Sequence, residues 1–172
     1  MQLAKLAGNF VIGTCGSPEK AEMLRQLGCD RVINYREENV GDVFKNEFRD
    51  RLDLVYESVG REMFDLCLRH LAVGGRLVII GMISEYLTEF ENVTQPRIYS
   101  YLLRKSASVR GMFLPHFNRR IPEYLPRLIE QYESGQIKVA IDDTPFDGIE
   151  SVVDAVEHLH SGRSRGKVVV RF

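Results

Sequence analysis

The chain has 172 residues, enough for one α/β domain with a buried core or for most of one domain with pieces of another. Apolar residues make up 44%, charged residues 27%, and the formal net charge is -1. No surplus of basic residues therefore favours nucleic acid or an anionic membrane as a partner, and we expect neither.

The three cysteines are Cys15, Cys29 and Cys67. They form no CxxC pair and have no spacing with the four histidines that is typical of a metal site. We therefore expect reduced, buried thiols, no bound metal and an intracellular, cytoplasmic protein. The N-terminal apolar stretch is too short to predict a signal peptide.

Short β-branched runs alternate with amphipathic helical stretches from Phe10 onward. This pattern favours parallel strands joined by crossover helices, so the expected class is an open α/β sheet. The predicted strands cover residues 10–14, 31–34, 52–57, 76–81 and 107–111. The predicted helices cover residues 18–27, 40–48, 62–71 and 96–104.

The two ends of the chain differ from this alternation. After Arg119 we predict a long helix through residue 134, a strand at 139–142, a helix at 149–160 and a final strand at 167–171.

Residues 1–8 are typical of the last two turns of an amphipathic helix with no cap before it. In a dinucleotide-binding unit, a strand and a glycine-rich turn for the pyrophosphate would precede such a helix. We therefore expect a Rossmann-like parallel sheet that lacks its first strand and glycine-rich loop, which leaves a gap in the sheet.

The segment from Gly13 to Lys20 lies at the end of the first predicted strand, where the adenosine ribose binds in nucleotide folds. An acid at this strand end would bind a free 2′-hydroxyl and repel a 2′-phosphate, and none is present. Instead Ser17, Lys20 and, after the next strand, Tyr35 offer a hydroxyl, a positive charge and a phenol. These side chains favour NADPH over NADH. The alternative is a helix cap, a solvated lysine and an edge aromatic.

Two later segments follow predicted strands at the carboxyl edge of the sheet, where open α/β folds bind ligands. Ser58 lies in a small-residue turn and is expected to face a cofactor, or else to serve only as a turn residue. Tyr86 lies beyond Gly81 and is placed to reach a ribose or a substrate carbonyl, or else is a surface aromatic. No GxSxG, Walker or HExxH motif supports a hydrolase or a kinase.

Six ordered motifs carry a resemblance to a known family. They are Gly-Thr-Cys-Gly-Ser-Pro-Glu-Lys at 13–20, Leu-Gly-Cys-Asp at 27–30, Ile-Asn-Tyr at 33–35, Val-Tyr-Glu-Ser-Val-Gly at 55–60, Gly-Arg-Leu-Val at 75–78 and Lys-Ser-Ala-Ser-Val-Arg-Gly at 105–111. Through nearly its whole length the chain resembles the quinone-oxidoreductase-like branch of the medium-chain dehydrogenases/reductases. In that branch a two-domain, zinc-free subunit holds NADPH, whose hydride passes to the β-carbon of an enone. The resemblance implies an NADPH-dependent, zinc-independent reductase of enones, such as 15-oxo-prostaglandin-like compounds, or of quinones.

Roles carried over by motif are implied by this resemblance alone. Tyr86 is the implied catalytic residue, beside the nicotinamide ribose and the substrate. Ser164 stands where the family usually has an asparagine that contacts the nicotinamide end of the cofactor. A serine can make only part of that contact. The implied cofactor-binding residues are Gly16, Ser17, Lys20, Tyr35, Ser58, Ile80, Tyr86, Met112, Phe113, Leu114 and Ser164.

The resemblance also implies a domain organisation. Residues 1–138 would form a partial nucleotide-binding domain, and residues 139–172 a segment that returns to the catalytic domain. A homodimer through the strand near 107–113 and a peroxisomal location stay open. Because the glycine-rich loop is missing, we expect this chain alone to be inactive. The alternative is a non-catalytic truncated isoform that binds nucleotide or an intact subunit.

Overall fold

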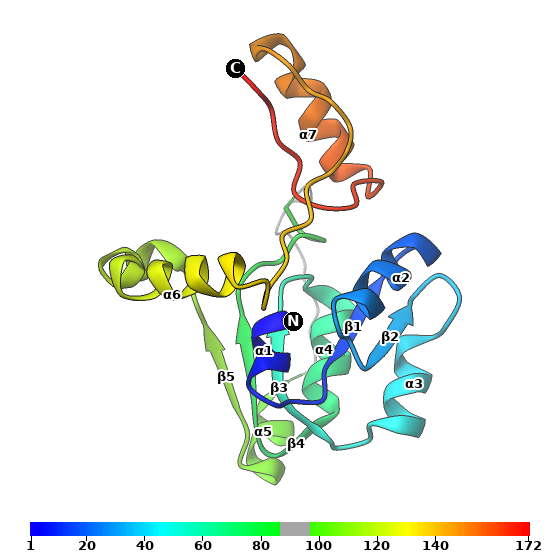
Figure 1. Ribbon diagram of the computed structural model, residues 1–172. Coiled ribbons are helices and arrows are strands. Elements are labelled where there is room, and N and C mark those ends of the chain that lie inside the picture. Colours follow the sequence, from blue (N-terminus) through cyan, green and yellow to red (C-terminus); the bar gives the residue numbers. More distant parts are fainter. Residues whose placement is uncertain (87–96) are drawn as a thin grey trace. The chain divides into compact units, whose positions relative to one another are not determined.

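The computed structural model describes residues 1–86 and 97–172 (Figure 1). They form two compact units, one made of Met1–Glu38 with Pro122–Phe172 and the other of Asn39–Ile121. Both units contain parallel strand pairs joined by helices. This confirms the predicted α/β class.

In the first unit, strands β1 (Ile12–Cys15) and β2 (Arg31–Asn34) pair in parallel, and helix α2 (Pro18–Gln26) connects them. Helix α2 begins where capping chemistry predicts, because the Ser17 side chain accepts a hydrogen bond from the Lys20 amide and Pro18 occupies the first turn. The unit also contains α1 (Gln2–Leu6), most of α6 (Ile121–Glu133), the 3₁₀ turn η2 (Ile149–Ser151) and α7 (Val152–His160). Its buried cluster consists of Cys15, Ala21, Cys29 and Val32, with Val11 and Leu24 packed against it.

The second unit is built on a three-stranded parallel sheet in the order β3 (Leu52–Glu57), β4 (Leu71–Ile79), β5 (Ser108–Gly111). Helix α4 (Arg61–Arg69) connects β3 to β4, and α3 (Val40–Glu47) precedes β3. Helix α5 (Tyr99–Lys105) precedes β5, and the 3₁₀ helix η1 (Leu114–Arg120) follows it. The largest fully buried side chains of this unit are Leu68, Leu71 and Leu77.

The described residues thus form two separate sheets, of two and three strands. Strand β3 pairs only with β4 among these residues. Leu54 and Tyr56 on β3 are 62% and 70% exposed, although parallel sheets are usually covered on both faces.

Strand β4 begins five residues earlier than the sequence predicts, at Leu71 instead of residue 76. The reason lies in the glycine pair, which we expected to be a turn before the strand. Gly74 has a φ of +74°, and a Cβ on Gly75 would lie 2.9 Å from the carbonyl oxygens of Ala72 and Leu52. The pair therefore forms an irregularity within the strand, where the register between β3 and β4 shifts.

The predicted strands at 139–142 and 167–171 are wrong as continuous strands. Among the described residues, Ile141 forms an isolated parallel bridge with Lys167, and a second isolated bridge joins Asp147, beyond the first predicted strand, to Arg171. Pro145 lies between the two bridges on the first segment and has no N–H to donate to a ladder. The predicted helix at 96–104 appears as α5, and its first position, Pro96, falls outside the described residues.

The three cysteines are free and buried, as expected. Burial raises the pKa of the Cys67 thiol to about 12, and the nearby Glu57 carboxylate adds to this shift. Within residues 1–86 and 97–172, no helix has the length and apolar character needed to cross a membrane.

Candidate functional site

The carboxyl edge of the three-stranded sheet brings together three of the predicted residues. Glu57 pairs with Ile79, and Ile79 pairs with Gly111, so the residues that follow these positions leave the sheet at the same edge. These residues are Ser58, Ile80 and Met112. The Ile80 amide donates to the Glu57 carbonyl at 2.8 Å, and the Met112 amide donates to the Ile79 carbonyl at 2.8 Å. Backbone pairing therefore fixes the three residues Ser58, Ile80 and Met112 in one row.

The turn after β3 is held by a buried carboxylate. Glu57 is only 3% exposed, and its Oε1 accepts hydrogen bonds from the amides of Val59 (2.7 Å) and Gly60 (2.9 Å). Gly60 has a φ of +86°, in the region that favours glycine. The sequence reasoning did not select Glu57, because a glutamate in a strand gives no signal that its side chain turns back onto its own loop.

The segment after β4 folds against the same turn. The Ser58 carbonyl accepts the Ile83 amide at 3.0 Å, and the Val59 carbonyl accepts both the Ser84 amide at 3.0 Å and the Ser84 hydroxyl at 2.5 Å. Glu85 accepts the Arg61 amide at 3.1 Å. The loops that follow β3 and β4 are therefore hydrogen-bonded into one edge.

Tyr86 lies over Gly81 at this edge. Its Oη accepts a hydrogen bond from the Met82 amide at 3.4 Å, and a Cβ on Gly81 would lie 3.1 Å from that oxygen. The side chain is 56% exposed. Because Oη acts as the acceptor in this contact, its own proton is not used in it.

Phe113 and Leu114 continue the chain from β5 into η1. Both side chains are mostly exposed, and the Phe113 ring meets His116 edge to face at 5.3 Å. The two side chains are not buried, and the backbone of these residues continues from Met112 along the carboxyl edge of the sheet.

The first unit contains a separate group of the predicted residues, at the end of β1. A Cβ on Gly16 would lie 2.7 Å from Cζ of Tyr35, so the phenol packs directly on the glycine backbone. Ser17 is the cap of α2, and its Oγ accepts the Lys20 amide at 3.3 Å. Ser17 therefore serves as a helix cap, the alternative role that the sequence left open for it. Its hydroxyl also lies beside Gly16.

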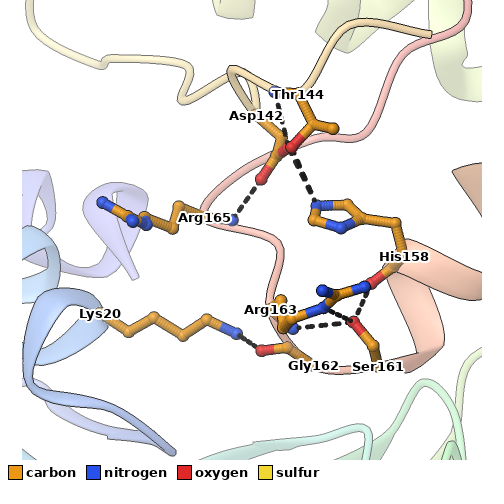
Figure 2. Close-up of polar contacts among 8 residues, drawn as sticks. All are labelled: Lys20, Asp142, Thr144, His158, Ser161, Gly162, Arg163 and Arg165. Carbon is orange, nitrogen blue, oxygen red and sulfur yellow. Dashed lines mark hydrogen bonds and ion pairs between the residues drawn. The ribbon is translucent and has the colours of Figure 1, made fainter.

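Lys20 reaches a loop from the C-terminal region (Figure 2). Its Nζ donates to the Gly162 carbonyl at 2.5 Å. The Ser161 hydroxyl oxygen accepts from both the amide (3.2 Å) and Nε (3.1 Å) of Arg163. Ser164 is half-buried and lies between Arg163 and Arg165. The arrangement gathers Lys20 and the 161–165 loop, a basic segment that the sequence reasoning considered only at Ser164.

Asp142 anchors that loop (Figure 2). Its carboxylate accepts hydrogen bonds from the amides of Arg165 (2.6 Å) and Thr144 (3.1 Å) and contacts His158 Nε2 at 3.0 Å. The hydrogen bond from the Arg165 amide, followed by those from Thr144, holds the pKa of Asp142 well below its usual range. Asp142 and His158 were missed from the sequence because residues 142, 158 and 165 meet only through the tertiary fold.

Both the sequence and the fold of this chain match those of known proteins. Residues 1–131 match the model of the family described as zinc-binding dehydrogenase. The chain belongs to this family. A probable quinone oxidoreductase from Leishmania amazonensis is 44% identical over 177 residues, with 100% of this chain and 52% of that protein covered. Prostaglandin reductase-3 from Mus musculus is 44% identical over 180 residues, with 100% of this chain and 48% of that protein covered.

Among solved structures, CurA from Vibrio vulnificus in complex with NADPH superposes with a TM-score of 0.86 at 26% identity, covering 98% of this chain and 51% of that one. The resemblance to the quinone-oxidoreductase-like medium-chain reductases is thus confirmed. The chain spans about half the length of the curated relatives it matches. Despite the family's description, the described residues contain no group of three or more histidine, cysteine, aspartate or glutamate side chains that could hold a metal ion.

Proposed function

We propose that this zinc-binding dehydrogenase family chain is the cofactor-binding, C-terminal part of an oxidoreductase that uses NADPH to reduce the double bond of enones, or quinones, without zinc. NADPH, when bound, supplies the hydride. Residues 139–172 belong, in this proposal, to the catalytic domain of the whole protein, and the substrate is a small molecule. A cytoplasmic location remains an expectation from the sequence, and a homodimer a possibility that the family resemblance implies.

The observation that carries the proposal is the row of Ser58, Ile80 and Met112 at the carboxyl ends of β3, β4 and β5. Neighbouring parallel strands place their ends side by side, and this edge is where open α/β sheets bind nucleotides. Backbone hydrogen bonds fix the row and the buried Glu57 carboxylate fixes its first turn. A site whose backbone is set before binding costs less ordering free energy when the ligand arrives.

The chemistry at the end of β1 supports a cofactor with a 2′-phosphate. Gly16, Ser17 and Tyr35 lie together there, and no residue of β1 itself carries a carboxylate; Glu19, on the first turn of α2, accepts a hydrogen bond from the Ser17 side chain. The ammonium group of Lys20 is on the first turn of α2, whose capped N-terminus also favours an anion.

The direct experiment is a calorimetric titration of the 172-residue chain with NADPH and, separately, with NADH. We expect saturable binding with at least about a tenfold preference for NADPH, since one charge-assisted contact to the 2′-phosphate contributes roughly 1.5–3 kcal/mol. Equal affinities would contradict the NADPH assignment. Binding of neither cofactor by a folded chain would favour the non-catalytic alternative.

Tyr86 is proposed as the catalytic residue, because Oη accepts the Met82 amide and keeps its proton for a substrate carbonyl. In the whole protein, Tyr86→Phe is expected to lower kcat for an enone about tenfold or more, with a smaller change in KM. Tyr99→Phe is the matched control, an exposed tyrosine outside the row. An unchanged kcat in Tyr86→Phe would remove Tyr86 from the reaction.

A further inference from the structure

Helix α4, which follows the turn after β3, has no cap from its own sequence. Its N-cap residue is Gly60, which offers no side chain to accept a hydrogen bond from the first turn. The first amides of a helix have no partner within the helix and need one from outside it. Glu85, 24 positions further along the chain, supplies such a partner, because its Oε1 accepts the Arg61 amide at 3.1 Å. The loop that follows β4 therefore caps α4.

The backbone at the start of α4 depends on such acceptors. Gly60 and Arg61 both have positive φ, +86° and +47°. Glycine adopts this conformation freely, whereas arginine is strained in it, and strained backbone persists only where its surroundings hold it. Glu57 accepts the amides of Val59 and Gly60, and Glu85 accepts the next amide, that of Arg61. Two carboxylates from different strand ends thus hold three successive amides.

Glu85 fits closely against the glycine at this junction. A Cβ on Gly60 would lie 2.7 Å from Glu85 Oε1 and 3.3 Å from Ser84 Oγ, so a larger residue would displace the carboxylate. The Ser84 hydroxyl donates to the Val59 carbonyl at 2.5 Å. A carboxylate at the first turn of a helix is also favoured by the helix dipole. Glu85 is therefore docked on α4, in agreement with its half-buried state.

Tyr86 is the next residue after this docking point. The Glu85 amide donates to the Met82 carbonyl at 2.8 Å, and the Tyr86 Oη accepts the Met82 amide at 3.4 Å. A Cβ on Gly81 would lie 3.1 Å from that Oη and 3.4 Å from the Ser58 carbonyl oxygen, so the phenol lies close to the turn after β3. A hydrogen bond of 3.4 Å is long and holds the ring only weakly. The adjacent anchor at Glu85 is the stronger restraint on this segment.

We propose that Glu85 is a positioning residue for Tyr86. Its carboxylate, docked on the first turn of α4, holds the segment 82–86 so that Tyr86 Oη stays over Gly81 at the carboxyl edge of the sheet. The inference rests on the proposed function, in which Tyr86 is the catalytic residue. Catalysis is sensitive to such placement, because a misplacement of about 1 Å can lower a rate about 100-fold.

The kinetic test uses the whole protein with an enone and NADPH. Glu85→Ala is expected to lower kcat about tenfold or more and to change KM about twofold or less, since a misplaced phenol affects the transition state more than substrate binding. Glu85→Gln keeps an acceptor for the Arg61 amide and should keep kcat within about threefold of the parent. Glu62→Ala is the matched control, because it removes an exposed acid from the first turn of the same helix, and should leave kcat unchanged.

A double-mutant cycle separates an action through Tyr86 from a general structural effect. In a Tyr86→Phe background, Glu85→Ala should lower kcat by no more than about twofold, because residues that act as one unit give non-additive losses. Three results would each overturn the proposal: an unchanged kcat in Glu85→Ala, additive losses in the double variant, or a kcat in Glu85→Gln as low as in Glu85→Ala. A loss in Glu62→Ala equal to that in Glu85→Ala would overturn it as well.

The position of the ring can be measured without any activity. In NMR spectra of the full chain, we expect a nuclear Overhauser effect between the Tyr86 ring and the Gly81 α-protons, kept in Glu85→Gln and lost in Glu85→Ala. A dispersed amide spectrum verifies that each variant is folded. An Overhauser effect that persists in Glu85→Ala contradicts the positioning role. If Tyr86→Phe keeps full kcat, the catalytic role proposed for Tyr86 fails, and this measurement still decides whether Glu85 positions the ring.

Discussion

Replacing Lys20 by glutamate is expected to lower the affinity for NADPH about 100-fold while changing the affinity for NADH only about threefold or less. The substitution removes a charge-assisted contact of roughly 1.5–3 kcal/mol and adds a carboxylate that repels the 2′-phosphate. Each 1.4 kcal/mol corresponds to about tenfold in affinity. The measurement is calorimetric titration of the variant with each cofactor.

Lys20 also donates to the Gly162 carbonyl, so its effect on the 161–165 loop must be separated from its effect on phosphate. Lys20→Gln keeps a hydrogen-bond donor without the charge and should give an intermediate loss of NADPH affinity. Arg25→Glu is a charge reversal on the same helix and should leave both affinities unchanged, since Arg25 is an exposed residue whose ion pair with Glu22 is a surface contact. Equal losses for NADH and NADPH in Lys20→Glu would show that Lys20 acts through the loop.

Glu57→Ala is expected to lower the free energy of unfolding by about 3 kcal/mol or more. The substitution leaves the amides of Val59 and Gly60 without their carboxylate acceptor in a buried position, and hydrogen bonds to a charged group contribute about 1.5–3 kcal/mol each. The measurement is urea unfolding followed by circular dichroism.

Glu57→Gln should cost less, because its amide carbonyl still accepts hydrogen bonds from the turn. Asp53→Ala is the matched control, an exposed acid on the same strand, and should change stability by about 0.5 kcal/mol or less. A loss in Glu57→Ala no larger than in Asp53→Ala would contradict the role of Glu57 in holding the edge.

Much of the fold could be predicted from local signals. The start of α2 follows from Ser17 and Pro18, because a cap and an N-terminal proline act within one helical turn. Strand β3 appears with the predicted bounds. The start of β4 was not predicted, since Gly74 and Gly75 suit a turn as well as an irregular strand, and the pairing with Leu52 decides between them.

The residues of the candidate site likewise divide into those that the sequence predicted and those that it did not. Ser58 and Tyr86 were selected because they follow predicted strands, and Ile80 because of the family resemblance; the structure places all three at one edge. Asp142 and His158 were not selected, because their contact crosses 16 positions and depends on the two bridges of the C-terminal region.

By itself, the sequence determined the α/β class, the family, most helix and strand positions and the burial of the cysteines, because these depend on periodicity, capping and ordered motifs along the chain. Only the tertiary structure decided the register that aligns Ser58, Ile80 and Met112, the inward turn of Glu57 and the Asp142 anchor. These features arise from pairing and burial between distant residues. Such contacts gain free energy only when the whole unit is folded, so no single segment encodes them.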